Sequence, residues 1–339
     1  MMQRMVYDYY GLYVEEQFQV GRYTGFATKD ANYLFVPESQ ENTSLWEEKL
    51  QWAQVMRQGD QTVALFIPSI QKNRSITLDG EKQLLFQLYV EKTRDDGTEE
   101  YNGSELATFH NQGMVMFPPV SSELFVQRWS EWWEKRLEQL ENWYQSVKTK
   151  PAFSLMDRWF IKTFPYYLGM TENAIQCLKA IPVHERTEEA GCISHFCYTP
   201  AAWVTIAPNT RPIKLPSDWL YDHPTRDIAE WMRYAMEQGY SHTQIENFVQ
   251  SYERHNQVTS FGWDLIIGRL LFPYYYLEQM EQTYLRENIG TMEETLYHLE
   301  QSWEKEGTRL EQIASLKEIF PYHFQKLPDW LLGRGVSFL

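Results

Sequence analysis

One stretch of the chain decides the fold, residues 191–224, which reads GCISHFCYTPAAWVTIAPNTRPIKLPSDWLYDHP. Its prolines and its short aromatic or β-branched runs are typical of loops and short strands. On both sides of it, apolar residues recur every three or four positions, the spacing of amphipathic helices. We therefore expect an irregular segment, called the embedded segment below, inside a helical half of the protein.

The chain from residue 121 onward is predicted to be mostly helical. Helices are expected at 123–148, 153–168, 172–180, 225–238, 241–255, 262–287, 292–306 and 308–320. We expect Thr171 to cap the third of these helices. In the first helix, Trp129, Trp132, Trp133 and Trp143 form a stripe that indicates a helix-packing face more readily than a ligand platform.

The first hundred residues are predicted to be rich in strands. Strands are expected at 13–20, 22–28, 32–36, 62–68 and 83–90, with one helix at 45–58 after the third strand. The acidic run 91–103 lacks the ordered ligands of a Ca²⁺ loop and is expected to be a solvated connection. Together these patterns predict an α+β protein. Its strand-rich lobe would span 1–90, its hinge and connecting loop 91–120, and its helical lobe 121–339.

The composition argues against several classes of partner. The 339 residues include 31 Lys plus Arg against 46 Asp plus Glu, a formal charge of −15, which disfavours nucleic acid and anionic membranes. With 43% apolar and 16% aromatic residues, the chain can bury a large core. The N-terminal residues lack the apolar run of a signal peptide, and the apolar stretch 265–277 is too short to span a bilayer. Three cysteines cannot form a complete set of disulfides, which favours a reducing site of synthesis.

The embedded segment resembles the catalytic segment of the aminoglycoside-phosphotransferase and protein-kinase-like superfamily. His195-Phe196-Cys197 stands where that superfamily has His-Gly-Asp, and Arg226-Asp227-Ile228-Ala229 is similar to its Arg-Asp-Leu-Ala helix start. The run from Arg269 to Tyr276 is similar to a Leu-Tyr-Pro-aromatic signature. The branch that the chain resembles most is the bacterial spore-coat type, the CotS/YutH type. The resemblance covers nearly the whole chain and implies a two-lobed, protein-kinase-like fold.

Several positions that carry chemistry in that superfamily are altered here. The resemblance places the catalytic Asp at Cys197, a metal-binding Asn at Ala202 and the second metal-binding Asp at Leu215. A thiol is a poor Mg²⁺ ligand and a methyl group is none. Asp218 or Asp222 could take over the metal role if the loop is shifted.

Two features that bind phosphate in that superfamily, a lysine and a glycine-rich turn, are also missing here. The strand at 34–37 lacks the lysine of the family, which leaves Glu47 or Glu48 on the following helix without that partner. The turn at 20–22 lacks a cluster of glycines to cover a triphosphate. Losing the base, a metal ligand and the lysine together removes most of what lowers the barrier to phosphoryl transfer.

Two family residues are kept, His195 and Asp227, and the resemblance implies that they brace the loop. It therefore implies a pseudokinase with no catalytic residues, cofactor or metal, acting as a structural or interaction component of the endospore coat. Such a protein would be made in the mother-cell cytoplasm, deposited in the coat and bound by other coat proteins, and its oligomeric state is left open.

Two alternatives are kept beside this interpretation. One is an active, atypical small-molecule phosphotransferase that uses ATP and Mg²⁺. The other is a module that binds a ligand without catalysis. A cleft filled by Trp203, Trp219 or Tyr221 would count against the binding module.

The cysteines and histidines of the segment allow sharper interpretations. Cys192, His195 and Cys197 could hold zinc with Cys177 or His184 as a fourth ligand, although such spacing is more often coincidental. Cys197 could be a nucleophile with His195 as its base, although an inert thiol is commoner.

Asp222 and His223 could form an acid–base pair. A turn that leads into the next helix explains both residues equally well.

Overall fold

The computed structural model describes residues 2–38, 43–78, 80–90, 103–114, 125–181, 191–208, 210–285, 292–324 and 327–332. By packing, the chain forms two compact units, Met1–Ser122 with Gly191–Asp227, and Glu123–Ala190 with Ile228–Leu339. The embedded segment thus packs with the strand-rich part of the chain. The predicted lobes follow chain order and this division follows packing, so the lobe boundaries stay a prediction.

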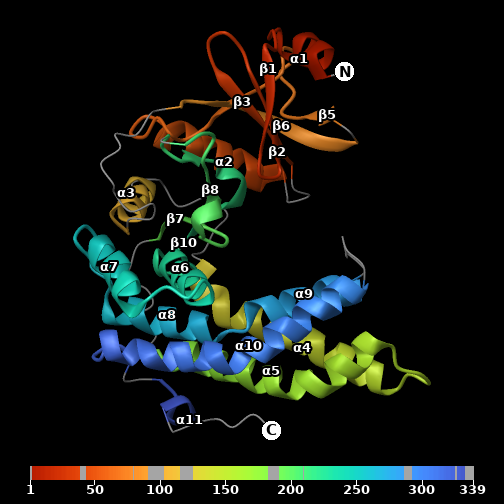
Figure 1. Ribbon diagram of the computed structural model, residues 1–339, viewed down its shortest axis with the longest axis vertical. Helices are drawn as coiled ribbons and strands as arrows, with labels where there is room; N and C mark the ends of the chain where they lie inside the picture. The colour runs from red at the N-terminus through yellow and green to blue at the C-terminus, as the bar shows by residue number, and fades with distance from the viewer. Residues whose placement is uncertain are drawn as a thin grey trace. The chain divides into compact units, whose positions relative to one another are not determined.

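An antiparallel sheet forms the centre of the first unit (Figure 1). Its strands run in the order β1-β2-β3-β6-β4, and β5 also pairs with β6. They are β1 Glu16–Val20, β2 Tyr23–Ala27, β3 Asn32–Pro37, β4 Leu65–Ile67, β5 Ile76–Leu78 and β6 Glu81–Leu88. Gly21 has a φ of +54° in the tight turn between β1 and β2, a conformation that glycine adopts without strain. The five predicted strands are confirmed with shifted ends, and β5 is additional.

The two faces of this sheet carry separate apolar cores, because side chains alternate along a strand. On β3, Tyr33 and Phe35 pack with residues of helix α1, Met2–Tyr10. Leu34 and Val36 point to the other face and pack with Trp46 of helix α2, Thr43–Met56. Helix α2 was predicted from its apolar spacing, whereas α1 was not.

Helix α3, Gly103–Met114, lies in a part of the chain that was predicted to be a connecting loop, and that prediction is wrong there. It packs directly on the first strand of the embedded segment. A Cβ atom at Gly113 would come within 2.7 Å of the backbone nitrogen of Ile193. Only glycine permits this approach, which brings the side chains of α3 against the segment.

The embedded segment is irregular, as predicted, and contains two short antiparallel pairs. They are formed by β7 Cys192–His195 with β10 Trp219–Asp222, and by β8 Trp203–Val204 with β9 Ile213–Lys214. The 3₁₀ turns η2 Pro200–Ala202 and η3 Pro216–Asp218 precede β8 and β10. The segment leads into helix α6, Thr225–Glu237.

The second unit is helical. Besides the remainder of α6, it contains α4 Phe125–Lys148, α5 Leu155–Lys179, α7 His242–Glu253, α8 Ser260–Leu271, α9 Tyr274–Leu285, α10 Met292–Ile319 and α11 Asp329–Leu332. Trp133 stacks on Phe272 with ring centroids 4.0 Å apart, and Trp129 is also buried, so the stripe on α4 is a packing face. Within the described residues, no helix is long and apolar enough to cross a bilayer.

Three helix boundaries differ from the prediction. Helix α5 is continuous, and Thr171 donates its hydroxyl to the carbonyl of Tyr167 inside the helix, so it is not a cap. The predicted helix 262–287 is broken at Phe272-Pro273, because proline cannot continue the hydrogen-bond ladder. The predicted pair 292–306 and 308–320 is one helix, α10, which accommodates Gly307.

Candidate functional site

The carboxylate of Asp227 in the first turn of α6 ties three elements of the first unit together. Its oxygens accept the backbone N–H of His195 at 2.9 Å and lie 2.7 Å from Nδ1 of that ring. Nε2 of His110 on α3 lies 3.0 Å from the same carboxylate. All three side chains are fully buried. Burial alone would raise the pKa of Asp227, but the charge and hydrogen bonds of the two imidazoles outweigh it and hold that pKa well below its usual value.

Trp203 fixes the proton arrangement of His195. Its indole N–H donates to Nε2 of the imidazole at 3.0 Å, and an indole nitrogen can only donate. Burial lowers the pKa of His195, and the charge and hydrogen bond of Asp227 raise it by more, so this pKa lies above its ordinary value. A second proton on this ring would have to sit on Nε2, opposite the indole N–H. In the neutral ring the proton therefore lies on Nδ1, and both ring nitrogens are occupied.

The positions altered relative to the superfamily lie in contrasting surroundings. Cys197 is exposed and Ala202 is half-buried in η2. Leu215, which follows β9 directly, is 1% exposed. It belongs to one apolar cluster with Val204 and Ile213 of the segment and with the sheet residues and Trp46 described above. An alkyl side chain therefore occupies the position where the resemblance expects a metal-binding carboxylate.

The two acidic residues that could have replaced Leu215 have other surroundings. Asp222 accepts a hydrogen bond from Nη1 of Arg226 at 2.9 Å and another from the backbone of His223. Asp218 is half-buried at the end of η3, and burial raises the pKa of its carboxyl. In the part of the chain that the structure describes, no three His, Cys, Asp or Glu side chains are grouped to hold a metal ion.

Helix α2 presents a lysine to the η3 turn, a contact that the sequence pattern did not predict. Glu47 is exposed and Glu48 half-buried, whereas Lys49 is only 2% exposed. Nζ of Lys49 donates to the carbonyl of Ser217 in η3 at 2.8 Å. It also lies 5.3 Å from the centroid of the Trp46 ring. The buried charge on this helix is thus a cation, where a carboxylate was expected.

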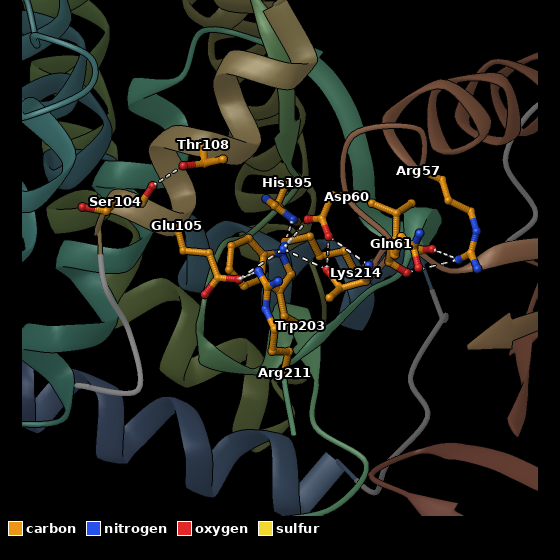
Figure 2. Close-up of polar contacts among 12 residues, drawn as sticks. Arg57, Asp60, Gln61, Ser104, Glu105, Thr108, His195, Trp203, Arg211 and Lys214 are labelled. Atoms are coloured by element: carbon orange, nitrogen blue, oxygen red, sulfur yellow. Dashed lines mark hydrogen bonds and ion pairs between the residues drawn. The ribbon is translucent and has the colours of Figure 1, made fainter. Parts of the chain in front are cut away.

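A second buried lysine, Lys214 of β9, is surrounded by acceptors from two other elements (Figure 2). Nζ lies 2.7 Å from the carboxylate of Asp60, 3.1 Å from the hydroxyl of Thr62 and 3.2 Å from the carboxylate of Glu105 on α3. The Trp203 ring covers it at 4.5 Å. Burial raises the pKa of Asp60, and Lys214 lowers it by more. This cluster anchors the β8–β9 hairpin to the loop after α2.

The described residues provide neither the ligands for the zinc site nor the free base for the Cys197 nucleophile that the sequence allowed. Both nitrogens of His195 are taken, so neither zinc binding nor proton abstraction from Cys197 has a ring nitrogen to use. Sγ of Cys192 contacts the hydroxyl of Ser194 at 3.3 Å. His184 and the acidic run 91–102 lie outside the described residues.

His223 lies 2.7 Å from the hydroxyl of Thr225, in the turn before α6. The Asp222 carboxylate accepts from Arg226. Asp222 and His223 therefore form the turn that leads into the next helix, the second of the two explanations given for them above.

The large rings of the segment are buried. Trp203, Trp219 and Tyr221 are each less than 8% exposed. Trp203 and Trp219 pack edge-on against Phe109 of α3, at 5.9 and 5.3 Å between centroids. They are thus part of the packing of α3 on the segment, while the apolar cluster that contains Leu215 packs between the segment and the sheet.

The sheet with helix α2, the paired strands of the embedded segment and the brace at Asp227 define a protein of the kinase-like class. An aminoglycoside phosphotransferase from Alicyclobacillus acidocaldarius superposes with a TM-score of 0.67 at 13% identity, covering 94% of this chain and 96% of that chain. A spectinomycin phosphotransferase superposes with a TM-score of 0.56 at 12% identity, covering 94% and 93%. Identities this low speak for the fold alone, and they confirm the predicted fold class.

The sequence comparisons are more specific. The family model described as spore coat putative kinase YutH matches residues 3–316. The endospore coat-associated protein YutH of Bacillus subtilis (strain 168) is 31% identical over 294 residues, which is 84% of each chain. The chain belongs to this YutH family, and the resemblance seen in the sequence is confirmed.

Proposed function

We propose that this chain is a catalytically inactive kinase-like protein that acts as a structural or interaction component of the endospore coat. The observation that carries the proposal is Leu215. It is buried in a continuous apolar cluster that joins the sheet to the β8–β9 hairpin. A Mg²⁺ ion needs oxygen ligands, and placing a carboxylate inside this cluster would require the cluster to open.

The surrounding residues do not fit a Mg²⁺–nucleotide complex either. In kinase-like enzymes such a complex supplies the phosphoryl group and neutralises its charge. Here Val36 lies on the strand where the lysine is missing, and it is 1% exposed in the same apolar cluster. Asp222 forms an ion pair with Arg226. Asp218 is the last residue of η3, and the preceding carbonyl, that of Ser217, accepts a hydrogen bond from Lys49. Each of these features withholds an oxygen ligand or a phosphate-binding cation.

The coat assignment rests on the family. The B. subtilis relative is described as endospore coat-associated, and we extend that location to this chain. It would be synthesised in the mother-cell cytoplasm and deposited in the coat through contacts with other coat proteins. A kinase-like fold without chemistry is suited to such a role, because its braces keep one rigid surface available for partners.

Thermal unfolding with and without ATP and Mg²⁺ tests the catalytic part. A ligand present at 100 times its Kd stabilises a protein by about 2.7 kcal/mol, so a binding site for ATP would be obvious. We expect no shift, and no transfer of phosphate from radiolabelled ATP to small amine or sugar acceptors. Mg²⁺-dependent transfer that is abolished by Asp218→Asn would overturn the proposal and favour an atypical phosphotransferase.

Complementation tests the coat part. The chain, fused to a fluorescent protein, is expressed in sporulating B. subtilis that lacks YutH. We expect the fusion to form a ring around the forespore and to complement the missing protein. A fusion that stays diffuse in the mother cell would contradict the coat assignment and leave the catalytic question to the ATP experiment.

A further inference from the structure

The loop after β9 has a cation of its own, the ammonium group of Lys49. In a kinase-like enzyme this loop carries a metal-binding carboxylate, and the ion helps to hold it. Here η3, residues Pro216–Asp218, instead receives a side chain from helix α2. We propose that Lys49 takes the place of a divalent cation, holding Ser217 and neutralising Asp218 so that the loop keeps its conformation with no metal or nucleotide bound.

The burial of Lys49 is the first argument. Lysine is rarely buried, because removing an ammonium group from water is costly unless acceptors and a counter-charge compensate. Lys49 is 2% exposed and donates to the Ser217 carbonyl at 2.8 Å. The residue that follows Ser217 is the half-buried acid Asp218. A backbone oxygen and a neighbouring carboxylate are the kinds of ligand that a divalent cation takes, and here the backbone oxygen accepts from an ammonium group.

The pattern of charge around the loop is the second argument. In the strand at 34–37, where the resemblance expects a lysine, Val36 is part of the apolar cluster, and so is Leu215, where it expects an acid. Helix α2 offers a buried Lys49 in the region where a carboxylate was expected. In this chain the buried positive charge next to the loop is therefore supplied by helix α2, and not by a lysine on the strand or by a bound metal ion. Burial raises the pKa of Asp218, and the charges of His195 and, to a smaller extent, Lys49 lower it without cancelling the effect of burial.

This inference deepens the proposed function and rests on it. Its test is a double-mutant cycle on the full chain, measured by thermal unfolding without nucleotide. Lys49→Met keeps the length of the side chain and removes the charge, which strands a half-buried carboxylate. We expect its Tm to fall on the order of 5–10 °C. Lys29→Met, the same substitution on an exposed turn, is the matched control and should leave Tm nearly unchanged.

The second arm of the cycle separates a charge pair from mere packing. Asp218→Asn removes the carboxylate, so in the double variant no unpaired charge is left. We expect the double variant to be clearly more stable than the sum of the two single losses predicts. Strictly additive losses, or a Lys49→Met variant as stable as the Lys29→Met control, would overturn the proposal.

Two further measurements keep the proposal testable if Lys49→Met does not fold. Acylation of Lys49, followed by mass spectrometry, should be slow in the unaltered chain and several-fold faster in Asp218→Asn; equal rates would overturn the proposal. Electron paramagnetic resonance of added Mn²⁺ should reveal no ion at this loop. A bound Mn²⁺ that is lost in Asp218→Asn would also overturn it. Because these measurements need no ATP, they can fail or succeed independently of the pseudokinase proposal.

Discussion

Two residues two positions apart, one at the end of β7 and one in the loop after it, are held very differently. His195 is fully buried, and its backbone and both ring nitrogens are engaged by Asp227 and Trp203. Cys197, at the position where the resemblance places the catalytic acid, is exposed. The residue that braces the loop is therefore held on all sides, while the residue that the resemblance places at the reacting position is open to solvent. This difference teaches that the fold depends on the brace and not on the chemistry.

A similar contrast between a side chain held by polar contacts and its neighbour is found at the end of β9. Lys214 has two carboxylates, a hydroxyl and an aromatic ring around its ammonium group. The next residue, Leu215, lies in an apolar cluster at the position where the resemblance places a metal ligand of the superfamily. Groups that hold the hairpin in place are satisfied internally, so no bound cofactor is needed to complete them.

The largest effect is expected for Asp227→Ala. It removes the acceptor of the His195 backbone N–H and leaves the buried rings of His195 and His110 without their common partner. We expect a loss of about 3–5 kcal/mol in the free energy of unfolding, measured by urea denaturation. Asp8→Ala, which breaks an exposed pair with Arg4, is the control and should cost well under about 1 kcal/mol. Equal losses in the two variants would show that Asp227 is not a brace.

Lys214→Met should have the next largest effect. It leaves the Asp60 carboxylate partly buried without its cation, and we expect a loss of about 2–4 kcal/mol in the free energy of unfolding. Lys135→Met is a matched control, because Lys135 lies 2.8 Å from Glu131 in a similar pair that is more than half exposed. That variant should change stability by about 0.5 kcal/mol or less. Similar losses would mean that burial does not distinguish the two pairs.

A smaller effect should appear in the pH dependence of stability. Burial lowers the pKa of His110, opposed by the Asp227 charge, and His195 and His223 also face this ring. The folded protein thus binds a proton at His110 less readily than the unfolded chain, whose histidine titrates near about 6.5. The contribution of His110 is present above that pH and is lost as the pH falls below it. Urea denaturation from pH 7.5 to 5 measures this decline.

His110→Gln isolates the contribution of this ring. Glutamine keeps an N–H that can donate to Asp227 but does not titrate in this range. We expect the variant to lose stability less steeply between pH 7 and pH 5 than the unaltered chain. An unchanged slope would assign the acid sensitivity to other groups.

Local patterns predicted most of the fold because helices and strands have their own spacing of apolar residues. The sheet, α2, α4 and α7 were predicted in this way. Helix α3 was missed because it follows an acidic run and contains Gly103 and Gly113, which lower helix propensity. It forms because its buried residues pack on β7, a contact with a segment far away in the sequence.

The site was predicted only where a motif carried it. His195 and Asp227 followed from the resemblance, and their contact joins residues 32 positions apart. Lys49, His110 and the Lys214–Asp60 pair carry no local signal. A single lysine or histidine on an amphipathic helix is usually solvated, and Lys214 and Asp60 are 154 residues apart. Burial alone distinguishes these residues, and burial is a property of the folded chain.

The smallest effect is expected where the superfamily has its catalytic acid. Cys197→Asp restores that residue at an exposed position, so the free energy of unfolding should change by about 0.5 kcal/mol or less, as it should in the control Cys197→Ser. Because Ala202 and Leu215 still offer no metal ligand, Cys197→Asp should transfer no phosphate from ATP with Mg²⁺. Transfer by Cys197→Asp but not by Cys197→Ser would show that a single substitution separates this fold from an enzyme. In that case the residue at position 197 alone would account for the difference between this chain and an active phosphotransferase.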